Sequence, residues 1–185
     1  MSQTAERLLT FEEFSQLPGD GRYELVNGRL EELVSPRPRH SWTGGRIFSL
    51  LDHYLTMHEP SAFWGIELDI PTVPHYGRRP DFVYFSAVDA ASRVDLEQNR
   101  VTGIPTLVVE VLSEDDEGRD LVTKRREYAA AGIKHYWILD PQRKAAEVLV
   151  LGEGTYEVDG EFSGNEPLFS DLFPGLQIPL SRLFR

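Results

Sequence analysis

The sequence contains no cysteine, which excludes disulfide bonds and metal sites built on thiolates. It also lacks any apolar run close to the roughly 18 residues that a membrane-spanning helix needs. The opening residues, MSQTAERLLT, carry Glu6 and Arg7 in place of the apolar stretch of a secretory signal. We therefore expect a cytoplasmic protein that makes no contact with a membrane.

Positive charge is scarce, because 19 Lys and Arg residues stand against 30 Asp and Glu residues and leave a formal net charge of −11. A protein that coats nucleic acid would carry a broad basic surface, so this function is disfavoured, whereas an enzyme with a small basic site is not. The five histidines show no H-E-x-x-H spacing, which gives little support to a zinc hydrolase. The length of 185 residues, 41% of them hydrophobic, favours one domain over residues 1–185.

The two ends of the chain carry recognisable local signals. Thr10 and Glu13 predict a capping box at the start of a short helix in LTFEEFSQLPGD. Asn27 and Gly28 favour a type I′ turn between two short strands in RYELVNGRLEELV. The tail, residues 168–185, is apolar and interrupted by proline, so we expect it to pack over the core as an irregular segment.

Hydrophobic periodicity predicts two further helices and several strands. The helices are expected over residues 40–58 and 121–131, and the second would be capped by Asp120 and ended by Gly132. The strands are expected over residues 62–70, 81–86, 106–112, 134–140 and 145–151. This order predicts an α/β (α+β) fold with a mixed central sheet flanked by helices.

A glutamate interrupts the most apolar of these strands, LVVEVL. Apolar residues on both sides of Glu110 indicate a strand covered on both faces, where a carboxylate without a partner costs several kcal/mol. One interpretation is an exposed glutamate on an edge strand, but alternation places Val108 and Leu112 on the same face as Glu110. The other interpretation is a metal ligand, since a cation compensates the buried charge.

Asp81 follows Pro80 at the entry to the strand DFVYFS. Taken alone, Pro-Asp is an ordinary turn pair. Together with Glu110 on a neighbouring strand, Asp81 can hold one hard divalent cation, because Mg²⁺ prefers oxygen ligands and is bound by one or two carboxylates. Such an ion activates water and stabilises charge on a phosphate.

Lys124 lies in the first turn of the helix expected over residues 121–131, next to Arg125 and Arg126. One interpretation is a solvated basic run on the helix surface. The other is a positive group that orients the attacking water or stabilises the charge that develops on the phosphate. Tyr128 follows four residues later and shares the same helix face.

The segments RPDFVYF and PTLVVEVLSEDDEGRDLVTKRREYAAAGIKHYWILDP resemble the Uma2 (DUF820) family of endonucleases, which is part of the PD-(D/E)xK nuclease superfamily. The motifs Pro-Asp, E-V-L-S, D-x-x-x-K-x-x-x-Y and G-x-x-x-Y-W-x-x-D-P occur in this order, and their combination is specific. YELVNG near the start, SPRPRH further on and LFPGLQIPLSRLF near the end extend the resemblance over nearly the whole chain.

This resemblance implies a restriction-endonuclease-like core with an N-terminal helix and hairpin, and phosphodiester hydrolysis that uses Mg²⁺ or Mn²⁺. Asp81 matches the aspartate of the Pro-Asp motif and Glu110 the acidic residue of the second half-motif. Both would hold the metal, together with the backbone carbonyl of Val111. Glu24 in YELVNG matches an early glutamate that can complete the acidic cluster. His40 after SPRPR matches a recurrent histidine, although a histidine at a helix start is more often structural.

The sequence departs from the superfamily pattern at one position. Leu112 stands two residues after Glu110, where a lysine is usual. In Uma2-like chains the lysine is on the following helix, where Lys124 fits, and only a helix that folds back can bring its ammonium to the site. Tyr128 and Asp120 on the same helix are candidates for supporting roles.

The leading hypothesis is a Mg²⁺- or Mn²⁺-dependent DNA endonuclease, in which four basic residues guide the phosphate backbone, namely Arg78, Arg79, Arg125 and Arg126. A second hypothesis is a noncatalytic interaction module that retains the nuclease fold. A third is a metal-dependent hydrolase that acts on RNA or nucleotides. The resemblance also implies a homodimer. The sequence predicts neither the recognition sequence nor whether one or both DNA strands are cut.

Overall fold

A six-stranded mixed sheet forms the centre of the protein. The computed structural model describes residues 7–18, 21–113 and 118–185, with the side chains of residues 118–120 excepted. The strands lie in the order β12-β11-β10-β9-β6-β3, in which β9 and β10 are parallel and all other neighbours are antiparallel. Their bounds are β3 (Phe63–Gly65), β6 (Phe82–Phe85), β9 (Leu107–Val111), β10 (His135–Asp140), β11 (Ala145–Leu151) and β12 (Tyr156–Ser163).

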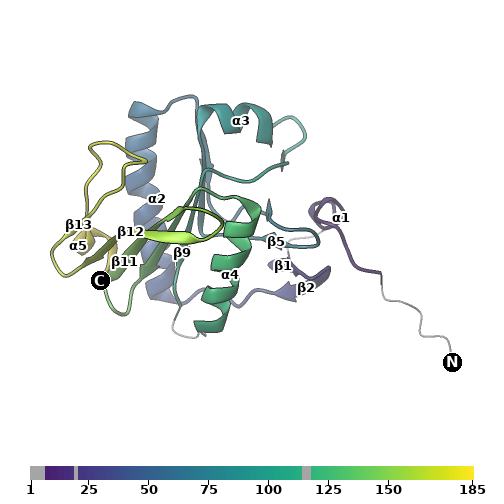
Figure 1. Ribbon diagram of the computed structural model, residues 1–185, viewed down its shortest axis with the longest axis horizontal. Coiled ribbons are helices and arrows are strands. Elements are labelled where there is room, and N and C mark those ends of the chain that lie inside the picture. The colour runs from purple at the N-terminus through teal and green to yellow at the C-terminus, as the bar shows by residue number, and fades with distance from the viewer. Residues whose placement is uncertain (1–6, 19–20, 114–117) are drawn as a thin grey trace.

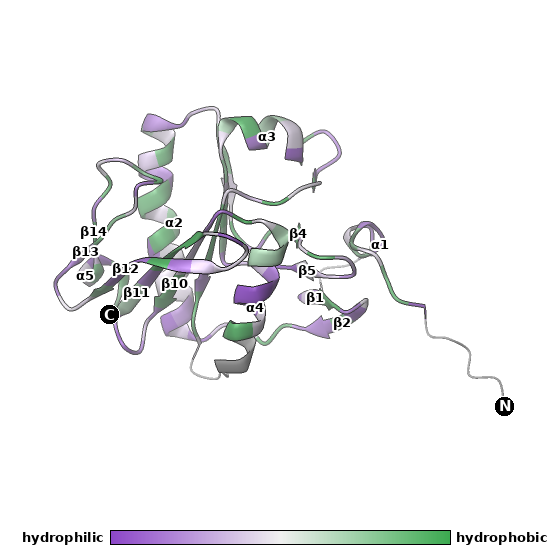
Figure 2. Cartoon of the chain, in the orientation of Figure 1, coloured by the Kyte–Doolittle hydropathy of each residue, from purple (hydrophilic) through white to green (hydrophobic). Residues whose placement is uncertain are grey.

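Two long helices cover the two faces of this sheet (Figure 1). α2 (Pro38–His58) lies on one face and buries Ile47 and Leu51 completely. α4 (Gly118–Ala131) lies on the other face, where Tyr128 is completely buried. Figure 2 shows green and purple residues alternating along α2, as expected for a helix with one apolar face toward a sheet. Every side chain of β9 is therefore buried, which confirms the expected strand with two covered faces.

The C-terminal segment closes the face of the sheet that carries α2. It forms the short ladder of β13 (Pro167–Leu168) with β14 (Ile178–Pro179), followed by α5 (Leu180–Leu183). Between the two strands, Phe173 packs edge to face against Trp137 of β10 at a ring distance of 5.7 Å. The prediction that the apolar tail packs over the core is confirmed.

A smaller sheet of four short strands, in the order β2-β1-β5-β4, stands beside the central sheet. Its hairpin turns at Asn27 and Gly28, whose φ angles of 49° and 74° confirm the expected type I′ turn. α1 (Phe11–Ser15), which begins with the predicted capping box, covers Gly77, where a Cβ would lie 2.6 Å from the Phe11 ring. The strands are β1 (Tyr23–Val26), β2 (Arg29–Glu32), β4 (Ile70–Pro71) and β5 (Gly77–Arg78).

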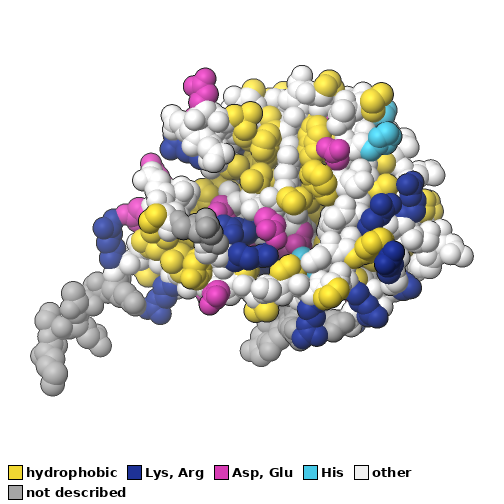
Figure 3. Space-filling model, turned by 180° about the vertical axis from the view of Figure 1, so that it is seen from behind, with side chains coloured by type: hydrophobic (Ala, Val, Ile, Leu, Met, Phe, Trp, Pro, Cys, Tyr) yellow, Lys and Arg dark blue, Asp and Glu magenta, His cyan; other side chains and the backbone are white. Residues whose placement is uncertain are grey.

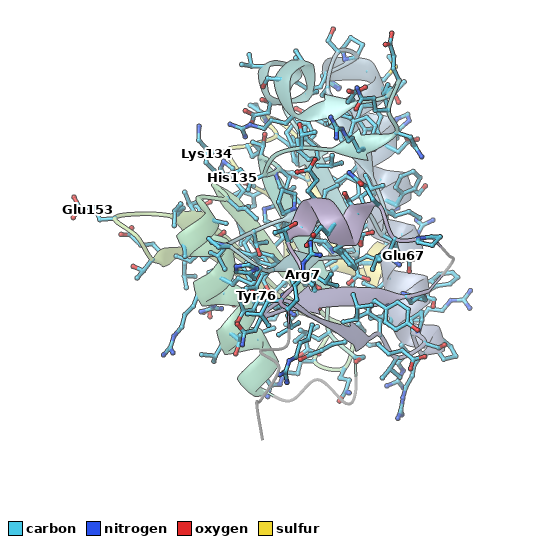
Figure 4. The ribbon with its side chains drawn as sticks, turned by 90° about the vertical axis from the view of Figure 1, so that its right-hand side faces the viewer. Arg7, Glu67, Tyr76, Lys134, His135 and Glu153 are labelled. Atoms are coloured by element: carbon cyan, nitrogen blue, oxygen red, sulfur yellow. The ribbon has the colours of Figure 1, made fainter. Side chains whose placement is uncertain are left out.

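The remaining elements lie between β6 and β9 and were not expected from the sequence. They are α3 (Ala87–Arg93) and the two-stranded ribbon of β7 (Val94–Asp95) with β8 (Arg100–Val101). Ser86 caps α3, since its side chain accepts a hydrogen bond from the Asp89 N–H. On another side of the molecule the β11–β12 hairpin projects outward, with Glu153 at its tip (Figure 4).

Three predicted boundaries are wrong. The strand expected over residues 62–70 is divided between β3 and β4, because the chain leaves the central sheet and Glu67 takes a φ of 50°. The helix expected from residue 40 begins at Pro38. α4 begins at Gly118, so the backbone of Asp120 lies inside its first turn and is not its cap, and Lys124 lies in the second turn.

Across the described ranges, no helix combines the length and the apolar character that crossing a membrane requires.

The end of α4 is fixed by Gly132, as predicted. Its φ of 86° lies in the left-handed region. The N–H of Ile133 donates to the carbonyl of Tyr128 at 3.1 Å and the N–H of Gly132 donates to that of Ala129 at 3.0 Å. These two bonds form a Schellman motif, which sets the point where the chain turns from α4 toward β10.

We expect Gly132→Ala to lower the free energy of unfolding by about 1 kcal/mol, since alanine is strained at a positive φ. Crowding adds little, because a Cβ would only reach Ile104 Cδ1, at 3.6 Å. Gly45→Ala within α2 is the matched control: a Cβ there meets nothing within 4 Å, and stability should rise by about 0.5–1 kcal/mol. Urea denaturation measures both changes, and the same sign for the two variants would contradict this account of Gly132.

Candidate active site

Two carboxylates meet where β6 and β9 lie side by side. Phe82 pairs with Val109, so continuing the antiparallel register places Asp81 opposite Glu110 on the same face of the sheet. Oδ2 of Asp81 accepts a hydrogen bond of 2.7 Å from the N–H of Val111, which fixes the carboxylate next to β9. The structure therefore brings together the two acidic residues that the sequence analysis paired.

The side chain of Glu110 is held by two residues of α4. The hydroxyl of Tyr128 donates to Oε1 at 2.6 Å, and Nζ of Lys124 lies 3.3 Å from Oε2. Lys124 and Tyr128 are four residues apart and so share one face of the helix. α4 folds back over the sheet as the lysine assignment requires, and the ammonium reaches the carboxylate across 14 residues of sequence.

Burial raises the pKa of Glu110 to about 7, and the nearby charges of Asp81 and Glu24 act in the same direction. The ammonium of Lys124 and the hydroxyl of Tyr128 act in the opposite direction but do not outweigh burial. Burial also raises the pKa of Tyr128 well above its usual value, so its hydroxyl remains a donor. Burial is thus the main reason why Glu110 is costly to ionise without a further cation.

A divalent cation fits this set of residues, because ionised Asp81 and Glu110 need positive charge and present hard oxygen atoms. The backbone carbonyl of Val111 could add a third oxygen. In the described part of the chain, no group of three His, Cys, Asp or Glu side chains is placed to hold a metal. The protein would therefore supply few ligands, as is common for Mg²⁺, which keeps waters and binds phosphate oxygens of a substrate.

His40 lies at this site as well. It is in the first turn of α2, and its Nε2 is 3.2 Å from Oδ1 of Asp81, with both side chains 17% exposed. The two oxygens of Asp81 are thus approached from opposite sides, by β9 and by α2. The structure places His40 in contact with Asp81 of the predicted acidic pair, a contact that the sequence analysis did not predict.

Glu24 reaches the same region from the hairpin, but its charge is matched by an arginine. Its Oε2 accepts a bond of 2.7 Å from Nη1 of Arg78, and its Oε1 accepts one of 3.1 Å from the N–H of Arg79. Although burial acts to raise it, the pKa of Glu24 is lowered by the charges of Lys124 and Arg78. Glu24 is therefore ionised, and Arg78 orients its carboxylate.

Arg78 also joins this region to α4. Its Nη2 donates to Oε2 of Glu127 at 2.8 Å, and the hydroxyl of Thr72 donates to the other oxygen of Glu127 at 2.5 Å. Arg78 is only 3% exposed, so this burial does not favour the expected contact with nucleic acid, which stays a prediction. The sequence analysis missed Glu127 and Thr72, and the only local sign was a charged residue on the sheet-facing side of α4.

The other basic residues lie in different surroundings. Arg79 borders the cleft and forms a two-bond ion pair with Asp69 at 2.8 Å. Arg125 pairs with Glu147 at 2.6 Å, and Arg126 is exposed on α4. The side chain of Asp120 lies outside the described residues.

A cleft of about 340 Å³ opens over these groups. It is lined by the acidic pair with Lys124 and by residues 31–37, which are the end of β2 and the segment that follows it. Figure 3 shows acidic side chains in the middle of this face with Lys and Arg side chains beside them. The cleft is open to solvent and polar, which suits a charged substrate rather than an apolar ligand.

Comparisons with known proteins agree with this geometry. A family model described as "Uma2: Putative restriction endonuclease" matches residues 11–181. The crystal structure of a putative nuclease belonging to DUF820 from Anabaena variabilis ATCC 29413 superposes with a TM-score of 0.74 at 19% identity, over 95% of this chain and 97% of that one. At this identity the likeness shows a shared fold. A search of curated proteins gave no match.

In metal-free protein, Glu110 should make stability fall as the pH rises. Its pKa is about 7 in the folded state and near the ordinary 4.5 when unfolded. Its favourable contribution is therefore complete below about pH 4.5 and is lost as the pH rises through about 7. The free energy of unfolding of Glu110→Gln, measured relative to the wild type with a chelator present, should therefore increase as the pH is raised. We expect the increase from pH 5 to pH 8 to be roughly 1–3 kcal/mol.

The exposed Glu153→Gln at the hairpin tip is the control for this experiment and should follow the wild type at every pH. Urea denaturation at each pH measures the difference. If the difference between Glu110→Gln and the wild type does not change with pH, the raised pKa of Glu110 is wrong.

Arg78→Met should lower the free energy of unfolding by about 3–5 kcal/mol, because it leaves two buried carboxylates without a counter-charge. The triple variant Glu24→Gln, Arg78→Met and Glu127→Gln removes those charges and should recover most of the loss. Urea denaturation at pH 7 measures both. A loss below about 1 kcal/mol in Arg78→Met would contradict the ion-pair network.

Proposed function

Because the chain belongs to the Uma2 family, we propose that it is a metal-dependent endonuclease that hydrolyses phosphodiester bonds of DNA. The observation that carries the proposal is the arrangement of Asp81 beside Glu110, with the ammonium of Lys124 3.3 Å from the Glu110 carboxylate. This combination offers oxygen ligands for one hard cation and a positive side chain in the same open cleft.

Mg²⁺ or Mn²⁺, when bound by these carboxylates, supplies charge neutralisation at the phosphate and activation of the attacking water. Val111 N–H and His40 orient Asp81, while Tyr128 orients Glu110, so both carboxylates are held before substrate arrives. Such preorganisation lowers the cost of assembling the site during the reaction.

Lys124 has the second chemical role in this proposal. Its side chain is 15% exposed and borders the cleft, so a small rotation turns the ammonium from Glu110 toward a phosphate. There it stabilises the negative charge that grows on the phosphate oxygens during attack by water, or orients that water. Glu24, held by Arg78, adds negative charge at the edge of the site.

The proposal includes a cytoplasmic location, which the lack of cysteine supports, and a homodimer that cuts both strands of a duplex. Support for the dimer comes from the family resemblance alone. Light scattering over a range of protein concentrations distinguishes a dimer from a monomer.

Supercoiled plasmid incubated with the protein and Mg²⁺ or Mn²⁺ should be cleaved, and a chelator should abolish cleavage. Asp81→Asn, Glu110→Gln and Lys124→Met should each slow cleavage by at least about 100-fold, as expected when a charge at a reacting centre is removed. Lys134→Met is the matched control. Lys134 is exposed at the opposite end of β10 and should leave the rate unchanged.

Cleavage that persists in all three site variants would show that another site is responsible. If no DNA is cut and calorimetry detects no metal binding, the noncatalytic module is the better account of the fold. Cleavage of RNA or nucleotides only would keep the site and change the substrate.

A further inference from the structure

The cleft continues beyond the catalytic residues, around the N-terminal end of α2. It shares Arg37, His40 and Ser113 with a second hollow of about 390 Å³. That hollow in turn shares Arg39 and Pro141 with a third one of about 240 Å³. The three hollows are therefore neighbours, and together they mark a path from Asp81 to the outer surface of α2.

The balance of charge changes along this path. The catalytic cleft is lined by five carboxylates and by five Lys or Arg side chains, whereas the described lining of the second and third hollows contains no carboxylate. Their charged side chains are arginines at positions 37, 39 and 185, and Arg37, Arg39 and Arg185 are exposed. Figure 3 shows Lys and Arg side chains gathered on the side where α2 lies. A local basic surface on a chain with a net charge of −11 favours a polyanionic partner.

The far end of the path carries an exposed aromatic ring. Trp42 lies on the outer side of α2 with 37% of its surface exposed. The guanidinium of Arg185 lies 3.8 Å from the centre of its ring. The guanidinium covers a face of the indole, so a base can stack on that face only if Arg185 swings aside, which would bring its positive charge to the phosphate next to the base.

We propose that a DNA strand leaves the cleavage site along this path, with its phosphates against Arg39 and Arg185 and one unpaired base stacked on Trp42. This inference rests on the proposed nuclease function, since it concerns the strand that the site would cut. It implies that the preferred substrate extends several nucleotides beyond the scissile phosphate and is single-stranded there, because a paired base cannot expose its face to Trp42.

A purely structural role for the same contact makes different predictions. Arg185 could serve only to fasten the end of the chain to α2. Arg46 already contributes to that, because its Nε donates to the carbonyl of Arg182 at 3.0 Å. A fastening role predicts that Arg185→Ala lowers stability without a specific effect on DNA, whereas the proposed role predicts weaker and less salt-dependent DNA binding.

The test measures binding of a labelled duplex with a single-stranded extension to the wild-type protein in EDTA, where metal-dependent cleavage cannot occur. Arg39→Ala and Arg185→Ala should each weaken binding by about 3- to 10-fold, and each should reduce the slope of log affinity against log salt by about 0.7, as for one lost phosphate contact to a single strand. Arg100→Ala on the β7–β8 ribbon, far from the path, should match the wild type.

Tryptophan fluorescence tests the stacking directly. DNA with the extension should quench the wild-type emission, whereas blunt duplex should not, and Trp42→Phe should lose this quenching while it keeps the salt slope. Of the other two tryptophans, Trp137 is completely buried. Urea denaturation of each variant separates a loss of binding from a loss of folded protein.

If the wild type binds and cleaves DNA but the arginine variants bind like Arg100→Ala, the path is wrong and the nuclease function stands. The path is equally overturned if binding falls only as far as folded protein is lost, or if no extension-dependent quenching occurs. A wild type that neither binds nor cleaves any DNA would overturn both the path and the proposed function.

Discussion

The buried carboxylate of Glu110 is the constraint around which the rest of the structure is arranged. β9 runs parallel to β10, and a parallel pair needs a crossover connection, here α4, which covers one face of the sheet. α2 covers the other face, so a charge on β9 has no route to bulk solvent except at the end of the strand. The same crossover helix that buries Glu110 supplies its two partners, Lys124 and Tyr128. The single connection between β9 and β10 thus both buries the carboxylate of Glu110 and provides the groups that compensate its charge.

This arrangement requires α4 to be placed accurately, and two features far apart in the sequence do so. At its C-terminal end, Gly132 stops the helix and turns the chain into β10. Along its length, Glu127 is tied through Arg78 to Glu24 in the hairpin. The smaller sheet therefore acts on the site through α4, because a shift of the hairpin would move the helix that carries Lys124. A buried ion pair adds little net stability, and its value here lies in fixing this geometry.

Local signals in the sequence were sufficient for the elements that depend on local physics. The capping box at Thr10, the type I′ turn at Asn27 and the glycine stop at Gly132 are each decided by a few neighbouring residues, and all three are present. The apolar residues around Glu110 also correctly predicted a strand covered on both faces. The contact of Glu110 with Lys124 was not, because it depends on how α4 packs, and only the resemblance to a family pointed to it.

The errors have a common cause in tertiary structure. Residues 62–70 alternate as one strand should, but alternation cannot show that the chain passes from one sheet to another at Glu67. Arg78 and Arg79 are adjacent and chemically identical, yet successive residues of a strand point to opposite sides. One guanidinium is enclosed between two carboxylates, and the other is less buried and pairs with Asp69. No property of the local sequence separates them.

The distribution of charge shows how a strongly acidic chain could be suited to the proposed polyanionic substrate. Inside the cleft Lys124 is paired with Glu110, and Arg78 with Glu24 and Glu127. The five Lys and Arg side chains that line the cleft are equalled by five carboxylates, so the metal-free cleft has no excess of positive charge to attract a phosphate. If the protein acts on DNA as proposed, the arginines along α2 would attract the DNA, and salt would weaken this attraction by screening the charges. Capture of the strand and reaction at the phosphate would then depend on different charges, so weakening one need not disturb the other.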